Sequence, residues 1–322
     1  MNLSRHKIFY WTIGIIVFLI SLMVTLSTVQ PSVSFWDCGE LSAASYGLQV
    51  THPPGAPFFI LVNRIFSLLP IAANIGLRIN LMTVFFSSLS IFFLYIVTVK
   101  LIENYLKPES DNLTGSIFTY LSAAVAALAF SFCDTFWFNS VESNVFGFST
   151  FLFSAIIMLA MLWNENSDKQ GSTKYLLLIA FLIGLSPGVH LMSVPALMPV
   201  VMIVVFKKYI IDEEYCKKSG YIFIGHAALL LIIGIILWAT QTGSQRPTQE
   251  EIKSFDNMFL GIMLAVSALF IFIFRKQVLN KNSFYFPIAV GAVALLIAYP
   301  GTVKYLTQLL GLVSGENILS LQ

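Results

Sequence analysis

The sequence predicts an all-α, polytopic membrane protein. Of its 322 residues, 57% are hydrophobic and only 11% are charged, and the mean hydropathy is +0.82. Apolar runs recur along the whole chain, and about 20 apolar residues suffice for a helix to cross the hydrocarbon core of a bilayer. This composition excludes a soluble globular domain. No basic patch indicates nucleic-acid binding.

We expect about nine transmembrane helices, since nine segments reach or approach the length of a span. The first follows the basic start Arg5-His6-Lys7 and lacks a small-residue cleavage pattern, so it predicts an uncleaved span with a cytoplasmic N-terminus. Three prolines suggest that the fifth and sixth spans are broken or tilted. The nine segments are residues 8–29, 78–99, 115–133, 145–163, 174–190, 191–206, 221–241, 257–274 and 284–300.

Residues 57–69 are apolar but too short to span. Asn63, Arg64 and Ser67 share one helical face, and apolar side chains cover the rest, a pattern typical of a helix that lies in the membrane interface. With this helix flat, 13 of the 18 Lys and Arg residues fall in cytoplasmic segments, as the positive-inside rule requires. Residues 30–77 then form a first extracytoplasmic loop and residues 134–144 a second. We expect residues 1–322 to form one domain.

The first loop concentrates ionisable groups. Asp37 and Glu40 are three residues apart, so on a helix they share a face, and a carboxylate there can act as a general base towards a hydroxyl. The alternative is that Asp37 only caps a helix beginning at Cys38. Trp36 adjoins this pair. His52-Pro53-Pro54-Gly55 joins an imidazole to a rigid turn, which would hold His52 against a ligand or serve only as a re-entry turn.

Other polar residues are expected on the same side. Arg78 begins the second predicted span. Its guanidinium would either bind a lipid-linked phosphate or only extend along the helix to the membrane–water interface, as snorkelling arginines do. Glu142 would orient an acceptor, bind a divalent cation such as Mg²⁺ or Mn²⁺ together with Asp37, or be only a solvated loop carboxylate. His190 would line a cavity or be a structural histidine. Weaker candidates are Asp134 and Trp137. Among the cysteines, Cys38 and Cys133 could pair if the topology holds.

The motif Phe35-Trp36-Asp37-Cys38-Gly39-Glu40, followed by Thr51-His52-Pro53-Pro54-Gly55-Ala56-Pro57, resembles the DUF2723 family of GT-C glycosyltransferases, which includes protein O-mannosyltransferases. The resemblance implies a GT-C-like bundle that transfers a sugar, mannose in particular, with inversion. The donor would be a polyprenyl-phosphate sugar, and the acceptor a Ser or Thr hydroxyl of a secreted or membrane protein.

The resemblance also assigns roles to residues. Asp37 would be the base, Glu40 the second acid and Glu142 the acid of the second loop, while His52 and Arg78 would position donor phosphate or acceptor. Family members commonly continue beyond these spans, so the chain would be a short member or a fragment truncated at its C-terminus.

Two other functions stay open from the sequence: a GT-C transferase acting on a glycolipid or cell-wall polymer, and a lipid or solute transporter. Transporters usually show repeated halves with ionisable groups at the bilayer midplane, and neither feature occurs in the sequence. We expect the protein in a bacterial inner membrane, in contact with membrane lipids, with its active site facing the periplasm.

Overall fold

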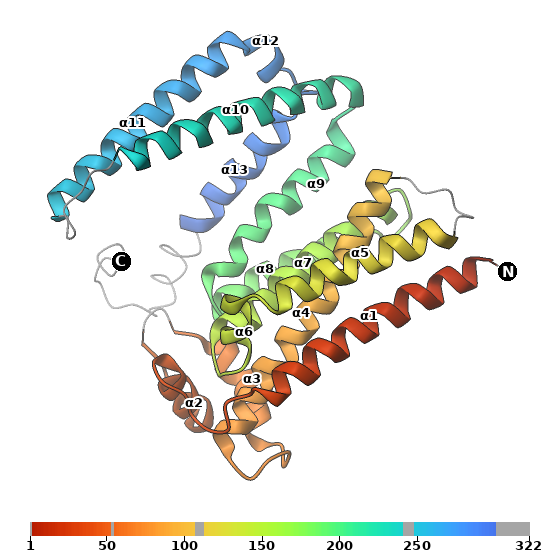
Figure 1. Cartoon of the computed structure of the whole chain (residues 1–322), viewed down its shortest axis with the longest axis vertical. Coiled ribbons are helices and arrows are strands. Elements are labelled where there is room, and N and C mark those ends of the chain that lie inside the picture. Colours follow the sequence, from red (N-terminus) through yellow and green to blue (C-terminus); the bar gives the residue numbers. More distant parts are fainter. Residues whose placement is uncertain (1, 53–54, 107–112, 241–247, 301–322) are drawn as a thin grey trace. The chain divides into compact units, whose positions relative to one another are not determined.

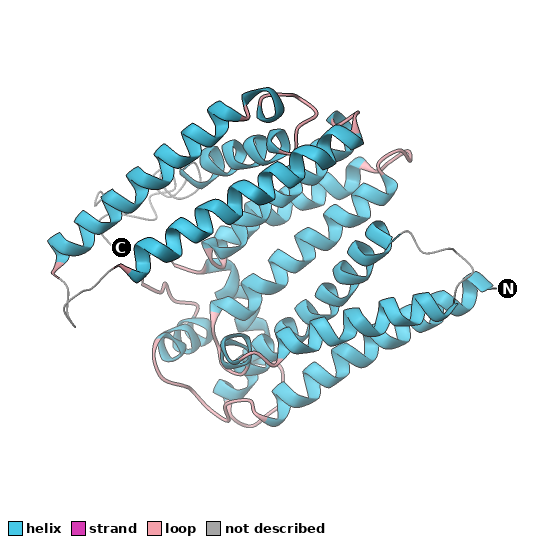
Figure 2. Cartoon of the chain, turned by 45° about the horizontal axis from the view of Figure 1, so that its top comes forward, coloured by secondary structure: helices cyan, strands magenta, loops and turns pink. Residues whose placement is uncertain are grey.

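A computed structural model describes residues 2–52, 55–106, 113–240 and 248–300. Within these ranges the chain is helical and contains no strand, as predicted (Figures 1 and 2). It divides into two compact units. Unit 1 comprises residues 1–200 and 294–322, and unit 2 comprises residues 201–293.

Unit 1 is built around the long helix α4 (Ile75–Leu106). This helix packs against α1 (Asn2–Ser27), α5 (Leu113–Ser131) and α7 (Val145–Asn166), and its start also contacts α3 (Pro57–Leu68). The remaining elements of the unit are the short helices α2 (Asp37–Gly47), α6 (Asp134–Ser140) and α8 (Thr173–Leu185), the 3-10 turns η1 (Ser186–Gly188) and η2 (Leu191–Ala196), and the start of α9 (Leu197–Tyr209).

Two apolar cores hold unit 1 together. One joins α1, α4, α5 and α6, and Ser21 of α1 also shares a hydrogen bond with Ser131 of α5 at 2.8 Å, a contact typical of helices that associate in lipid. The second core joins α2, α3, α4 and α7, and it lies directly beneath the short helix that carries Asp37 and Glu40. Its members include Leu41, Ala44, Phe59, Met82, Phe148 and Leu152.

Unit 2 contains the end of α9, then α10 (Glu213–Ala239), α11 (Gln249–Ile273), α12 (Arg275–Val278) and the first part of α13 (Tyr285–Pro300). Both long helices begin at capping residues. The Asp212 side chain accepts from the Tyr215 amide, and Thr248 and Glu251 form a capping box. The buried ring of His226 on α10 stacks on Phe270 of α11, with centroids 4.4 Å apart.

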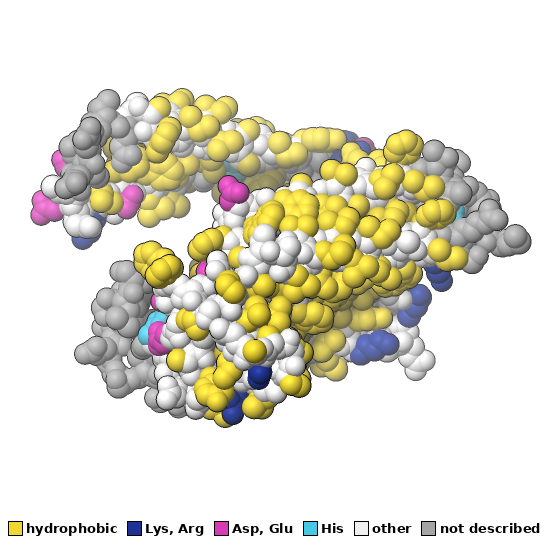
Figure 3. Space-filling view, turned by 60° about the horizontal axis from the view of Figure 1, so that its bottom comes forward, with side chains coloured by type: hydrophobic (Ala, Val, Ile, Leu, Met, Phe, Trp, Pro, Cys, Tyr) yellow, Lys and Arg dark blue, Asp and Glu magenta, His cyan; other side chains and the backbone are white. Residues whose placement is uncertain are grey.

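Among the described residues, six helices are long and apolar enough to cross a membrane, and a seventh span is added if α5 and α6, bent by 70° at their junction, form one broken span. The fifth and ninth predicted spans form shorter apolar helices, so the number nine is not confirmed. The fifth and sixth predicted spans are expected to be broken or tilted, and each contains a 3-10 segment: η1 with Pro187 ends the fifth, and η2 with Pro195 begins the sixth before α9. Apolar side chains cover much of the visible helical surface (Figure 3).

Residues 57–69 form a helix close to the predicted bounds, but its polar stripe faces inward. Asn63 and Ser67 are buried, and the Asn63 amide donates to Ser143 Oγ at 3.4 Å. The exposed ridge consists instead of Leu61, Ile65 and Leu68. The interfacial position of this helix stays a prediction; the structure shows only that its buried polar residues face protein and that its exposed ridge is apolar.

Candidate functional site

Helix α2 is held in place by its contacts with α3. Leu41 and Ala44 pack in the same apolar core as Phe59. At the end of α2, Arg64 Nη1 donates to the Tyr46 carbonyl at 2.6 Å, and the guanidinium lies 5.2 Å from the centre of the Tyr46 ring. A cation at a helix C-terminus satisfies a free carbonyl and complements the helix dipole. The α3 helix therefore fixes the position of the α2 carboxylates.

The chain enters α2 through a strained residue. Trp36 has φ 61° and ψ −144°, a region that favours glycine, and its indole is 91% exposed. Trp36 occupies the N-cap position without a side-chain cap, and Asp37 is already the first helical residue. The alternative that Asp37 caps a helix starting at Cys38 is therefore wrong.

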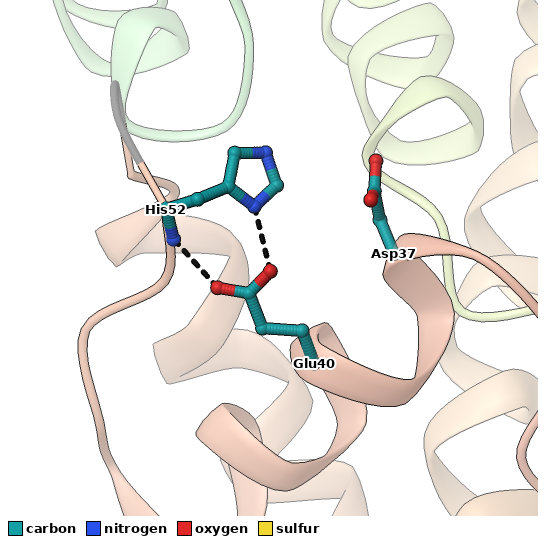
Figure 4. Close-up of side chains that lie close together, drawn as sticks. All are labelled: Asp37, Glu40 and His52. Atoms are coloured by element: carbon teal, nitrogen blue, oxygen red, sulfur yellow. Dashed lines mark hydrogen bonds and ion pairs between the residues drawn. The ribbon is translucent and has the colours of Figure 1, made fainter.

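Asp37, Glu40 and His52 lie together at one surface (Figure 4). Each of them offers a ligand or acid–base atom, and these atoms all lie within 4.8 Å of one another. Asp37 and Glu40 both lie in the first turn of α2, and His52 comes from the loop before α3. The helical spacing predicted a shared face for the two acids, and the loop brings the imidazole to it. Pro53 and Pro54 of the predicted turn lie outside the described residues.

Glu40 and His52 form a two-point contact. The His52 amide donates to Glu40 Oε1 at 2.6 Å, and Nδ1 of the imidazole lies 2.7 Å from Oε2. These hydrogen bonds hold the pKa of the Glu40 carboxyl below its ordinary value of 4.5. The same side-chain bond raises the pKa of His52 above 6.5, against the opposing effect of partial burial. A carboxylate–imidazolium pair is thereby favoured.

Asp37 differs from Glu40 in its surroundings. Within the part of the chain that the structure describes, its carboxylate forms no hydrogen bond or ion pair, and it points to the same side as the His52 ring (Figure 4). Both Glu40 oxygens are engaged by His52, whereas those of Asp37 are available to a ligand. Asp37 is therefore the carboxylate able to accept a proton from a bound molecule.

Arg78 has a structural environment. Its Nε donates to the Ala72 carbonyl at 2.5 Å and its Nη1 to the Ser67 carbonyl at 3.1 Å. These bonds hold the turn between α3 and α4. The partly buried guanidinium thus satisfies backbone carbonyls near the site, and its expected contact with a donor phosphate stays a prediction.

Glu142 is buried, with 6% of its surface exposed, in the turn between α6 and α7. Burial, and then the negative charge of Glu142, raise the pKa of the thiol of Cys38, the second residue of α2, to about 12. Glu142 is absent from the group of ligand atoms that joins Asp37, Glu40 and His52. The metal pairing of Asp37 with Glu142 is untested and stays a prediction.

The other expected residues occupy different places. His190 begins η2, where its Nδ1 accepts from the Met192 amide at 3.1 Å, and its ring meets Phe146 edge-on. Asp134 is exposed at the start of α6. Trp137 donates from Nε1 to Thr28 Oγ1 at 3.0 Å. The three cysteines are free, so Cys38 and Cys133 are not paired.

Sequence reasoning missed Asn80, which organises the loops around the site. Its buried amide donates to the carbonyls of Gln30 and Ser32, each at 2.8 Å, and its Oδ1 accepts from the Ser143 amide at 2.9 Å. One side chain on α4 therefore holds both the segment that leads to Asp37 and the turn that carries Glu142. The signal was an amide in an otherwise apolar span, where polar side chains usually bond between helices.

Comparison with known proteins places this chain in a family. The family model described as the N-terminal domain of protein O-mannosyl-transferase TMEM260 matches residues 37–212, which include Asp37, Glu40, His52, Arg78 and Glu142. A relative named "Protein O-mannosyl-transferase tmem260" from Dictyostelium discoideum is 28% identical over 156 residues, which are 47% of this chain and 17% of the relative. The protein of the same name from Mus musculus is 27% identical over 159 residues, 49% of this chain and 20% of the relative.

The chain thus spans about a fifth of the length of these curated relatives. No solved structure matches it. Because the family model covers more than half of the 322 residues, the chain belongs to the TMEM260 N-terminal domain family.

Proposed function

We propose that this protein is a membrane glycosyltransferase that moves a sugar, mannose in particular, from a polyprenyl-phosphate donor to Ser or Thr hydroxyls of translocated proteins. The observation that carries the proposal is the unengaged carboxylate of Asp37 beside the Glu40–His52 pair. The names of the two relatives support protein O-mannosylation. The lipid-linked donor and the roles below rest on the residues and on physical argument.

In the proposed reaction Asp37 accepts the proton of the acceptor hydroxyl as its oxygen forms a bond to the anomeric carbon. The bond from this carbon to the phosphate oxygen breaks, and its electron pair leaves with the phosphate. Because nucleophile and leaving group occupy opposite faces of the sugar, the configuration inverts.

Charge on the departing phosphate needs stabilisation. The imidazolium of His52 is the cation of this cluster, and Glu40 keeps it protonated and oriented through two hydrogen bonds. Glu40 therefore acts on the reaction through His52. Trp36, exposed next to Asp37, offers an aromatic surface to the sugar.

The ligand atoms of Asp37, Glu40 and His52 also fit a divalent cation that accepts both oxygen and nitrogen, such as Mn²⁺, better than Mg²⁺. The contact between Glu40 and His52 would have to open for both side chains to bind such an ion. A cation would supply further positive charge for the leaving phosphate. Transfer measured with and without a chelator distinguishes a site that uses the Glu40–His52 pair alone from one that needs a bound cation.

We place this site on the extracytoplasmic side of the membrane. Within unit 1, α2, α3 and α6 lie at one end and the N-terminus at the other (Figure 1). The basic side chains Lys100, Lys169 and Lys174 belong to the segments at the N-terminal end, as the positive-inside rule requires of a cytoplasmic face. The bacterial inner membrane stays a prediction, since both relatives come from eukaryotes.

The test incubates the purified protein with a set of polyprenyl-phosphate sugars and an acceptor peptide and reads the peptide mass. Asp37→Asn is expected to reduce transfer by about 100-fold or more, because a general base supplies that much. The matched control is Asp134→Asn, an exposed first-turn acid of another short helix, which should transfer normally. Normal transfer by the Asp37 variant would remove the proposed base.

A further inference from the structure

Two turns at one end of unit 2 carry basic side chains that the proposed reaction does not use. Residues 207–218 join α9 to α10, and residues 275–281 run from α12 towards α13. These two segments hold seven basic and three acidic side chains. All seven basic side chains are exposed, and together they form what we call the basic surface: Lys207, Lys208, Lys217, Lys218, Arg275, Lys276 and Lys281.

The three acids leave this surface positive. Asp212 caps α10, where its side chain accepts from the Tyr215 amide. Glu214 pairs with Lys218 at 2.8 Å, and both side chains of this ion pair are exposed. The third acid is Glu213. Seven cations against three anions leave an excess of positive charge at this end of the unit.

Hydrogen bonds hold the two turns together. Asn282 Oδ1 accepts from the amides of Ile211 at 3.0 Å and Asp212 at 3.3 Å. The Tyr215 hydroxyl donates to the Lys276 carbonyl at 2.9 Å. The start of α10 and the helix α12 accordingly lie at the same end of unit 2 (Figure 1). The cations of the two turns therefore belong to one surface, although about 60 residues of chain separate them.

Apolar side chains project beside these cations. Ile211 is 81% exposed and Leu279 is 77% exposed, and both lie outside the helices. Tyr209, the last residue of α9, is 61% exposed. Exposed large apolar side chains that gather in one place mark an interaction surface. Cations beside such side chains are typical of protein surfaces that lie against lipid, with the charges among the phosphates and the apolar side chains at the acyl boundary.

We infer that the basic surface binds the anionic headgroups of phospholipids in the leaflet that it contacts. The helices α10 and α11 are long and apolar enough to cross a membrane, so headgroups lie within reach of the turns at their ends. The positive-inside rule accounts for a basic end but not for the exposed Ile211 and Leu279. The inference is independent of the proposed function and holds for either orientation in the membrane.

The first test uses the wild-type protein reconstituted in phosphatidylcholine bilayers with a trace of spin-labelled phosphatidylglycerol or spin-labelled phosphatidylcholine. Electron paramagnetic resonance measures how much of each labelled lipid is immobilised at the protein. Phosphatidylglycerol should associate about fivefold more strongly, the effect that one cation supplies near an anionic surface. High salt should shrink this preference through screening. Equal association of the two lipids would overturn the inference, even if the protein bound polyglutamate, which would indicate an acidic protein partner instead.

The second test removes cations from both turns. Lys217→Gln/Lys276→Gln/Lys281→Gln should bring the association of phosphatidylglycerol down to that of phosphatidylcholine. All three side chains are exposed, so the variant should unfold at the same temperature as the wild type. A variant that keeps the full preference for phosphatidylglycerol would show that the basic surface does not bind the lipid.

The matched control loses the same charge elsewhere. Lys169, Lys174 and Lys253 are also exposed but lie outside the basic surface. Their triple replacement by glutamine should leave the lipid preference unchanged. Equal losses in the two triple variants would show that the overall charge of the protein, and not this surface, attracts the anionic lipid, and the inference would fail. Sugar transfer is not measured in any of these experiments, so failure of the proposed function would leave their outcome unchanged.

Discussion

Single polar side chains decide the geometry of this site more than the apolar majority does. Asn80 fixes two loops through three hydrogen bonds, and Glu40 engages His52 through both of its oxygens. Asp37 has no such partner among the described residues, which is why we propose it as the base. The two carboxylates of α2 differ because the loop histidine His52 contacts Glu40 and leaves the Asp37 oxygens without a hydrogen bond among the described residues.

Replacing Asn80 by alanine should destabilise unit 1 by about 3 kcal/mol, since three hydrogen bonds of about 1 kcal/mol each are lost at a buried position. Thermal unfolding in detergent measures the effect. The control is Asn166→Ala. Among the described residues its side chain bonds locally, to the Leu162 carbonyl and to Lys169 Nζ at an exposed site, and about 1 kcal/mol is expected there. Equal losses of stability in the two variants would show that the hydrogen bonds of Asn80 contribute no more than those of an ordinary helical asparagine.

The Glu40–His52 pair predicts how activity and stability depend on pH. The lowered pKa of Glu40 contributes stability above its ordinary value of 4.5, and this contribution is lost as the pH falls through the folded value. The raised pKa of His52 contributes stability below 6.5, and this is lost as the pH rises through the folded value. The pair is therefore fully effective between 4.5 and 6.5.

Glu40→Gln should move the alkaline limb of the pH–rate profile to lower pH, because His52 then loses its proton at a lower pH. The profile of the Asp134→Asn variant should coincide with that of the wild type. A Glu40 variant whose alkaline limb stays in place would show that the imidazolium is not required for transfer.

At the scale of elements, close helix packing depends on small residues. Helices α4 and α7 form the most extensive helix pair in the described chain, and Gly147 of α7 lies against Thr83 and Ser87 of α4. A Cβ on Gly147 would overlap Ser87 Oγ and lie 2.6 Å from Thr83 Cγ2. Both hydroxyl-bearing residues are buried, so neither can move into open space.

Gly147→Ala should therefore destabilise the protein by about 1–3 kcal/mol through overpacking. Gly184→Ala is the matched control. It also lies in a helix, but its added methyl group meets nothing within 4 Å, so its stability should be unchanged or slightly higher. Thermal unfolding compares the two, and a Gly147 variant as stable as the Gly184 variant would contradict the packing argument.

At the scale of the whole molecule, the proposal requires that the site face the extracytoplasmic side of the membrane. Cys133 is exposed at the end of α5, beside the second loop, whereas Lys169 lies in the turn between α7 and α8. If the site faces outward, a membrane-impermeant maleimide should label Cys133 in intact cells. In a Cys133→Ala background, Lys169→Cys should be labelled only after permeabilisation. The reverse pattern would place the site on the cytoplasmic face and remove the acceptor we propose.

Much of the architecture was predictable because lipid imposes strong rules on sequence. Long apolar runs predicted all-helical spans, prolines predicted irregular helices in the fifth and sixth spans, and the Asp-x-x-Glu spacing predicted two carboxylates on one face. The number of spans is not confirmed where α5 and α6 bend and where the described parts of α8 and α13 are short. Propensity and hydropathy do not fix helix length, since tertiary packing decides where a short apolar helix ends.

The sequence by itself determined the membrane class, the family resemblance and the cluster of acids and imidazole in the first loop, because composition, motif and helical spacing are local properties. Only the tertiary structure decided that Glu40 binds His52, that Arg78 holds a turn and that the polar stripe of α3 faces inward. A hydrogen bond between residues far apart in the chain depends on how helices pack, and a linear pattern carries no such distances.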